Sequence, residues 1–280
     1  MNGWRFAFSR RWLGYLAVAV VFAIACVALA NWQLARRTEA LTEIARVAMN
    51  WDSTPRALTD VLPQLSSFSD GDKWMPVTMT GHYLRDSQIL VRGRPLDGDA
   101  GFEVLDPLEL ADGTVFVVDR GWLPVGSEQD EPDTIPAAPD GQVTVVARLK
   151  AGEPTVLGRS APPGQIATIH LPDIASRLGK PTYTAAYGVL ASEDPAPTTR
   201  PTAAEKPIAD EGPHLSYAFQ WVAFALMGFF GLGWAIRQEY RVRNADDPRE
   251  RERAAERKRK SDAKPRSDSE TEDAILDSAK

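Results

Sequence analysis

The sequence has few of the residues from which disulfides, metal sites and nucleophilic active sites are built. Its single cysteine, Cys26, lies in an apolar run, so an internal disulfide and a thiolate metal cluster are both excluded. It contains no phosphate-binding loop, no His-Glu-x-x-His and no Gly-x-Ser-x-Gly motif. Of the three histidines, His82 and His170 have no recognisable motif around them and are expected to be surface or strand residues. A hydrolase would need one of them to meet a serine and an acid.

Positive charge is scarce in the middle of the chain. Residues 36–213 hold 16 Lys and Arg against 26 Asp and Glu. Nucleic-acid binding needs clustered cations for the phosphates, so this acidic stretch argues against it.

Two long runs lack charge altogether, Trp12–Ala35 and Leu215–Ile236. A helix needs about 20 apolar residues to cross a bilayer core of ~30 Å. Trp12 and Trp32 lie 20 residues apart, which is ~30 Å along a helix, so each indole would lie at one membrane interface. We expect transmembrane helices over residues 12–35 and 214–236. The alternative for the first run is a signal peptide cleaved after Ala28-Leu29-Ala30, but the run is longer than a normal signal core.

Cations near the ends of the spans predict the orientation. Two precede the second span closely, Arg200 and Lys206, whereas six arginines follow it: Arg237, Arg241, Arg243, Arg249, Arg251 and Arg253. The predicted protein is therefore multi-pass in the cell membrane. Both termini, residues 1–11 and a charged, disordered tail 237–280, face the cytoplasm, and residues 36–213 lie outside it. Part of that tail, from Tyr240 to about Lys260, is compatible with one solvated helix.

The middle segment is expected to be a β-rich (α+β) extracytoplasmic domain. A helix over Thr38–Met49 should continue out of the first span, and Ser53/Thr54 before Pro55 predicts the start of a short second helix. Gly126–Gly141 and Glu193–Pro213 are expected to be irregular. Strands so close together favour an antiparallel, partly closed barrel. The predicted strands are Val77–Tyr83, Gln88–Arg92, Phe102–Leu110, Val115–Arg120, Gln142–Leu149 and Tyr183–Leu190, with a hairpin turn at Ala111-Asp112-Gly113 and a helix at Pro172–Leu178.

His214 differs from the other histidines because it begins the second span, next to Pro213. A neutral imidazole there could ligate a haem iron, with Trp221 two turns deeper on the same face. The alternative is an interfacial histidine that hydrogen-bonds lipid or the neighbouring domain. One face of this span carries small residues at helical spacing, and so does the first span at Ala19 and Ala23; small residues let membrane helices approach closely. The alternative is that Ala and Gly are simply common in any membrane helix. That face of the second span comprises His214, Ala218, Trp221, Ala225 and Gly228.

Three blocks of sequence resemble the Surfeit locus protein 1 family. The first is Trp32-Gln33-Leu34-Ala35-Arg36, similar to the family's Trp-Gln-x-x-Arg. The second is Arg120-Gly121-Trp122-Leu123-Pro124, similar to its Arg-Gly-Trp-x-Pro. The third is His214-Leu215-Ser216-Tyr217-Ala218-Phe219-Gln220-Trp221 at the start of the second span. The resemblance covers residues from about 12 to 240.

The resemblance implies an assembly factor for cytochrome c oxidase and not an enzyme. It implies that haem a is bound transiently, with His214 as the ligand, and passed from haem a synthase to the large oxidase subunit. A haem-free scaffold for an assembly intermediate is the alternative. Arg120 could pair with a haem propionate, or the Arg-Gly-Trp block could simply end a strand, with Trp122 covering the core. The sequence departs from the family at Ala30, where glycine is usual, and in the tail beyond Tyr240.

Overall fold

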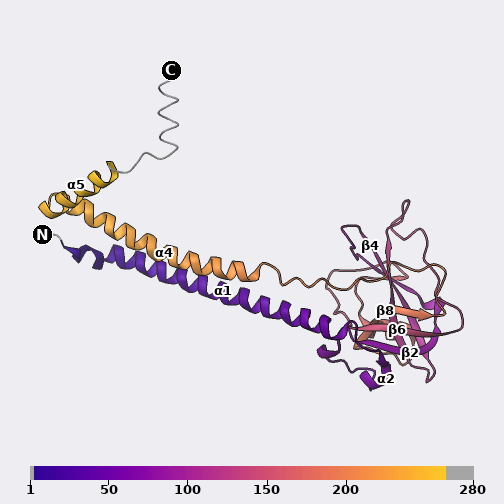
Figure 1. Cartoon of the computed structure of the whole chain (residues 1–280). Coiled ribbons are helices and arrows are strands. Elements are labelled where there is room, and N and C mark those ends of the chain that lie inside the picture. Colours follow the sequence, from indigo (N-terminus) through magenta and orange to yellow (C-terminus); the bar gives the residue numbers. More distant parts are fainter. Residues whose placement is uncertain (1–2, 263–280) are drawn as a thin grey trace. The chain divides into compact units, whose positions relative to one another are not determined.

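The computed structural model describes residues 3–262. The chain divides into two compact units, one formed by Met1–Thr38 with Gly212–Lys280 and the other by Glu39–Glu211. Figure 1 shows both units, whose positions relative to one another are not determined.

The first unit is helical. It contains the short 3₁₀ helix η1 (Trp4–Phe8), the first part of α1 (Arg10–Asn50), α4 (His214–Arg243) and α5 (Pro248–Asp262). By length and composition, α1 and α4 could each cross a membrane. The helix expected over Thr38–Met49 is confirmed, because α1 continues without a break to Asn50.

Within this unit α4 lies antiparallel to the first part of α1 (Figure 1). At one end the side chains of Gln33 and His214 meet, and at the other Arg11 lies 3.7 Å from Glu239. Between these ends, small residues allow close approach, as predicted. A Cβ placed on Gly228 would lie 3.4 Å from Phe22, and on α1 the side chains of Cys26 and Ala30 are buried while Ala19 and Ala23 are half-buried.

The charged tail does not form a single helix from Tyr240 to Lys260, so that expectation was wrong. Helix α4 ends at Arg243, and α5 begins anew at Pro248. Proline suits the first turn of a helix, where its missing N–H costs nothing. The Asp247 carboxylate caps this start, because its Oδ1 accepts a hydrogen bond from the Arg249 N–H at 2.9 Å. The tail from residue 263 onward lies outside the described residues.

The second unit is built around one mixed sheet of eight strands. Five of them, β2, β6, β8, β5 and β4, form a closed ring, because β2 pairs with β6 along most of its length and with β4 at its end. The six expected strands and the barrel are therefore confirmed. The strands are β1 (Arg56–Ala57), β2 (Pro76–Tyr83), β3 (Ile89–Arg92), β4 (Gly101–Leu110), β5 (Val115–Pro124), β6 (Gln142–Ala151), β7 (Gln165–Ile166) and β8 (Ala186–Asp194).

Three details of this sheet differ from the expectation. The two-residue strands β1 and β7 are too short to give a pattern in the sequence. The β1–β2, β3–β7 and β5–β8 pairs are parallel, whereas the remaining pairs are antiparallel as expected. Strand β8 extends to Asp194, so the irregular segment that leads from β8 to α4 begins two residues later than predicted. We call this segment, residues 195–213, the tether.

A glycine makes the barrel closure possible. Gly81 lies where β2 passes from β6 to β4, and a Cβ there would stand 2.3 Å from the Glu109 carbonyl oxygen. Only a residue without a side chain allows the two backbones to come this close.

Alternating residues of the barrel strands form its main core, which includes Val77, Met79, Leu108, Phe116 and Val145. A second core forms where α3 (Leu171–Leu178) packs beside Val117 and Tyr187. The short helix α2 (Leu58–Val61) covers part of the main core with Leu58 and begins after Ala57. The expected start at Ser53/Thr54 was wrong because Pro55 leads into β1 instead.

Candidate functional site

Two of the motif blocks meet in the helical unit. His214 is the first residue of α4, and its Nδ1 lies 2.8 Å from Oε1 of Gln33 on α1. These residues are 181 positions apart in the sequence. The antiparallel packing of α1 and α4 brings them together at one end of the helix pair.

This contact selects the tautomer of the neutral histidine. An amide oxygen only accepts hydrogen bonds, so Nδ1 must carry the proton that it donates to Gln33. In the neutral imidazole the other nitrogen, Nε2, then has a free lone pair, which is the state that a metal ligand requires. Nε2 faces the backbone of Gly212, where a Cβ would stand 3.3 Å from it. With glycine at position 212, this residue places no side chain against that edge of the ring.

The other motif residues of this unit differ in how far they are buried. Trp221 is half-buried two turns along α4 and packs edge-on against Phe224, with ring centroids 5.8 Å apart. Leu215 is half-buried beside the histidine. The motif residues Trp32, Arg36, Tyr217 and Gln220 are exposed. The half-buried apolar and aromatic side chains suit a flat hydrophobic group next to the imidazole.

Arg120 belongs to a different place, the interior of the barrel. It is 1% exposed, and its guanidinium lies 3.2 Å from Asp106 Oδ2 on β4 and 3.0 Å from Glu193 Oε1 on β8. It also donates a hydrogen bond to the carbonyl oxygen of Pro136. The Tyr83 hydroxyl completes the cluster by donating to Glu193 Oε2 at 2.9 Å.

Four barrel strands thus contribute to one buried charge cluster, which we call the Arg120 cluster (Tyr83, Asp106, Arg120, Glu193). Burial raises the pKa of Asp106, and the Arg120 guanidinium opposes that rise. Two buried carboxylates already pair with the guanidinium, which argues against the expected pairing of Arg120 with a haem propionate. The structure favours the structural interpretation of the Arg-Gly-Trp block.

Gly121 and Trp122 hold the tether that leads to α4. The Trp122 N–H and carbonyl each pair with Thr202 at 2.9 Å. Gly121 has φ +129°, and a Cβ on it would stand 2.3 Å from the Thr202 carbonyl oxygen. The block therefore needs glycine here so that the tether can lie against β5. Its last residue, Pro124, ends β5 and is exposed.

A cavity of about 420 Å³ lies beside this contact, lined by Asp119, Glu103, Trp122 and tether residues 202–208. Burial raises the pKa of Asp119 to about 8, and the neighbouring Glu103 carboxylate adds to the rise. The Asp119 Oδ1 accepts a hydrogen bond from the Gly121 N–H. No sequence pattern indicated this buried acid as unusual, since it depends on the pairing of β4 with β5.

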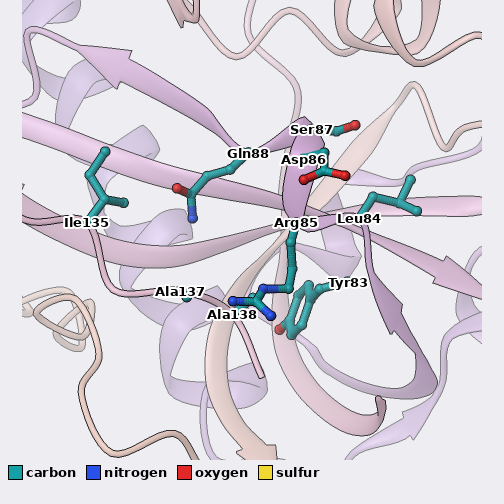
Figure 2. A pocket seen from close by; sticks show the side chains of 9 residues that line it. All are labelled: Tyr83, Leu84, Arg85, Asp86, Ser87, Gln88, Ile135, Ala137 and Ala138. Atoms are coloured by element: carbon teal, nitrogen blue, oxygen red, sulfur yellow. The ribbon is translucent and has the colours of Figure 1, made fainter. Parts of the chain in front are cut away.

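Another cavity of the barrel unit, about 700 Å³, opens beside the Arg120 cluster. Figure 2 shows Tyr83 and Arg85 next to one another at this pocket, with Gln88 and Ile135 across from them. Two of its polar side chains, Gln88 and Arg85, already have partners. Gln88 donates hydrogen bonds to both carboxylate oxygens of Asp106, and Arg85 forms an ion pair with Asp140.

The remaining histidines form no catalytic set. His82 is exposed on β2, and His170 lies before α3 with its Nδ1 3.0 Å from Asp173 Oδ2. Across residues 3–262 no serine hydroxyl is hydrogen-bonded to either ring, and no three His, Cys, Asp or Glu side chains are grouped to hold a metal ion.

Comparison with known proteins agrees with the motif blocks. The SURF1 family model matches residues 20–226. Uncharacterised SURF1-like proteins of Mycobacterium tuberculosis and Mycobacterium bovis are 34% identical over 251 residues, which cover 86% of this chain and 90% of theirs. A SURF1-like protein of Dictyostelium discoideum is 29% identical over 107 residues, 36% of this chain and 40% of its own. The chain therefore belongs to the SURF1 family, whose members are known in general as assembly factors of cytochrome oxidase.

Proposed function

We propose that this protein assists the assembly of cytochrome c oxidase by binding haem a transiently at His214. In this proposal α1 and α4 span the cell membrane, the termini are cytoplasmic and the barrel unit is extracytoplasmic. Haem a would be received from haem a synthase and delivered to the large oxidase subunit.

The observation that carries the proposal is the hydrogen bond between His214 and Gln33. Histidines that bind metals almost always donate their second ring N–H to a fixed acceptor, which selects the tautomer and orients the ring. Gln33 is such an acceptor for His214. Haem iron accepts a neutral histidine nitrogen as an axial ligand, and Nε2 is the nitrogen left for it.

The surroundings of His214 fit a porphyrin. The imidazole lies at the end of an uncharged stretch of α4, and Leu215, Trp221 and Phe224 offer apolar and aromatic surface on the half-buried side of the helix. A porphyrin is a flat apolar group whose burial against such side chains is favourable. Polar propionates would lie toward the water side of the interface.

The proposal is tested by co-expressing the full-length protein with a haem a synthase and measuring the haem a absorption per purified chain. His214→Ala should carry at least tenfold less haem a than the wild type. His82→Ala is the matched control, since His82 is exposed on β2, and it should retain the wild-type amount. Equal haem a in wild type and His214→Ala would refute the ligand role. Co-purification with the large oxidase subunit but no haem a in any variant would favour a haem-free scaffold.

A further inference from the structure

A small basic cavity lies where the apolar run of α4 ends. It has a volume of about 250 Å³ and is formed within the helical unit by the last turns of α4, the first turns of α5 and η1. This is smaller than the roughly 300–1,000 Å³ of sites for whole drug-sized ligands. It suits a single charged group. Its lining residues are Trp4, Arg237, Tyr240, Arg241, Glu250, Arg253 and Arg257.

The cavity has too little negative charge to balance its arginines. Glu250 is its one acid, with a side chain that is 9% exposed. This carboxylate lies 3.0 Å from Arg253 and 3.7 Å from Arg257, both on α5. The charge of Glu250 is thus shared between two guanidinium groups, and none remains for the α4 side of the cavity.

Arg237 and Arg241 form that α4 side. They are four residues apart, so their side chains lie one above the other on the same face of the helix, where like charges repel. Within the described residues 3–262, neither has a carboxylate at ion-pair distance. The nearest acid along α4, Glu239, is occupied by Arg243 at 2.9 Å and by Arg11 at 3.7 Å. The guanidinium groups of Arg237 and Arg241 therefore face the cavity without a carboxylate partner of their own.

Aromatic residues place this cavity at the boundary of an apolar medium. Trp4 stacks on Tyr240 with ring centroids 4.3 Å apart and an interplanar angle of 15°. Arg237 is the first charged residue after the uncharged run that ends at Ile236. Tryptophan and tyrosine next to the first charges after a span are typical of the headgroup level of a bilayer.

We propose that this cavity binds the phosphate of an anionic lipid headgroup through Arg237 and Arg241. A guanidinium makes two parallel N–H···O hydrogen bonds to phosphate, so two guanidiniums one turn apart can hold one phosphate between them. Basic pockets at the cytoplasmic ends of membrane helices bind such headgroups. The inference rests on the proposed function only in that α1 and α4 span the membrane, and it does not depend on haem. Free phosphate offers the same chemistry, and the experiment distinguishes the two sources.

The test uses the full-length protein in maltoside micelles, where binding does not depend on the orientation of the chain in the cell. Phosphatidylglycerol is titrated in, with phosphatidylcholine as the zwitterionic reference, and bound lipid is counted by native mass spectrometry. Arg237→Gln with Arg241→Gln should weaken phosphatidylglycerol binding at least tenfold. The control pair is Arg249→Gln with Arg259→Gln, which removes the same charge from exposed positions outside the cavity. It should change binding less than twofold.

Inorganic phosphate identifies the source of the anion. If 20-fold excess phosphate fails to displace phosphatidylglycerol, the site recognises the lipid. If phosphate displaces it from the wild type but has no effect on the double variant, the site takes free phosphate as well, and the assignment of the cavity still stands. Equal phosphatidylglycerol binding by wild type and the Arg237/Arg241 variant would overturn the inference, as would an equal loss in the control pair. Carbonate extraction of membranes checks the spans separately, and haem a content checks the proposed function.

Discussion

Replacing Arg120 by methionine should destabilise the barrel unit strongly and more so at neutral than at acidic pH. Methionine extends only as far as the arginine Nε and carries no charge, so Arg120→Met keeps the apolar stem but leaves the Asp106 and Glu193 carboxylates without their partner. Both are buried, with side chains 0% and 3% exposed. A buried carboxylate without a counter-charge is costly in a medium of low dielectric constant.

The size of the effect follows from this burial. Removing one partner from a buried ion pair costs about 3–5 kcal/mol in the free energy of unfolding. For a unit of this size, 1 kcal/mol corresponds to about 2–4 °C in the melting temperature, so we expect a fall of roughly 10 °C. The surface ion pair between Arg85 and Asp140 is the matched comparison, because exposed pairs contribute less than about 1 kcal/mol. Arg85→Met should therefore shift the melting temperature little.

The pH dependence gives a second, independent reading. Burial raises the pKa of Asp106 and Arg120 lowers it, so without Arg120 the carboxyl group takes up a proton more readily. Protonation removes the uncompensated charge, and the destabilisation by Arg120→Met should shrink as the pH falls from 7 to 5. Near-ultraviolet circular dichroism of the full-length protein in micelles, recorded during heating, measures both effects.

Neutralising the partners supplies the decisive control. Adding Asp106→Asn and Glu193→Gln to Arg120→Met should restore most of the lost stability, because no buried charge then remains unpaired. A loss that is equal at pH 5 and pH 7, and that the added substitutions do not restore, would refute the argument from charge. It would mean that the shape of the Arg120 side chain matters instead.

Three further predictions concern the Asp119, Gly121 and Gln33 positions. The pKa of Asp119 is about 8 when folded and about 3.9 when unfolded, so the folded state holds the extra proton, and stability falls as the pH rises toward 8. Asp119→Asn should flatten that fall in thermal melts between pH 5 and pH 9, since the amide oxygen can still accept from the Gly121 N–H. Gly121→Ala should cost about 1–3 kcal/mol in chemical unfolding, through its positive φ and its clash with the Thr202 carbonyl; a variant as stable as the wild type would contradict this close approach. Gln33→Leu should reduce bound haem a about tenfold and should mix the two tautomers of His214 in nitrogen-15 NMR of the haem-free protein, whereas a single unchanged tautomer would show that Gln33 does not set it.

The sequence predicted the elements well because their signals are local. Uncharged runs of 22 or more residues mark α1 and α4, and segments rich in Val, Ile, Thr and aromatic residues between Gly, Asp and Pro mark the longer strands. The failures were local as well. Ser53/Thr54 before Pro55 resembles a helix start, but a short parallel pairing with β2 prevails there. In the tail, Pro248 and the Asp247 cap break a run of charges that composition alone treats as uniform.

The site could be predicted only in part, because its contacts join distant residues. The sequence singled out His214, Gln33 and Arg120 through the family resemblance, but it gave no sign that Gln33 accepts the His214 proton. It also suggested a haem propionate as the partner of Arg120. In the structure the partners are Asp106 and Glu193, which lie 14 and 73 positions from Arg120 in the sequence. Such pairings depend on strand register and helix packing, which are properties of the folded chain.

Exchanging the ligand at position 214 tests the central claim most directly. In His214→Cys, co-expressed with a haem a synthase, any haem a that remains bound should have an altered Soret band and an altered electron paramagnetic resonance spectrum, because a sulfur ligand replaces a nitrogen ligand. If the bound haem a of His214→Cys has the same spectra as that of the wild type, the iron is held by another residue, and the proposed site at the His214–Gln33 contact is wrong.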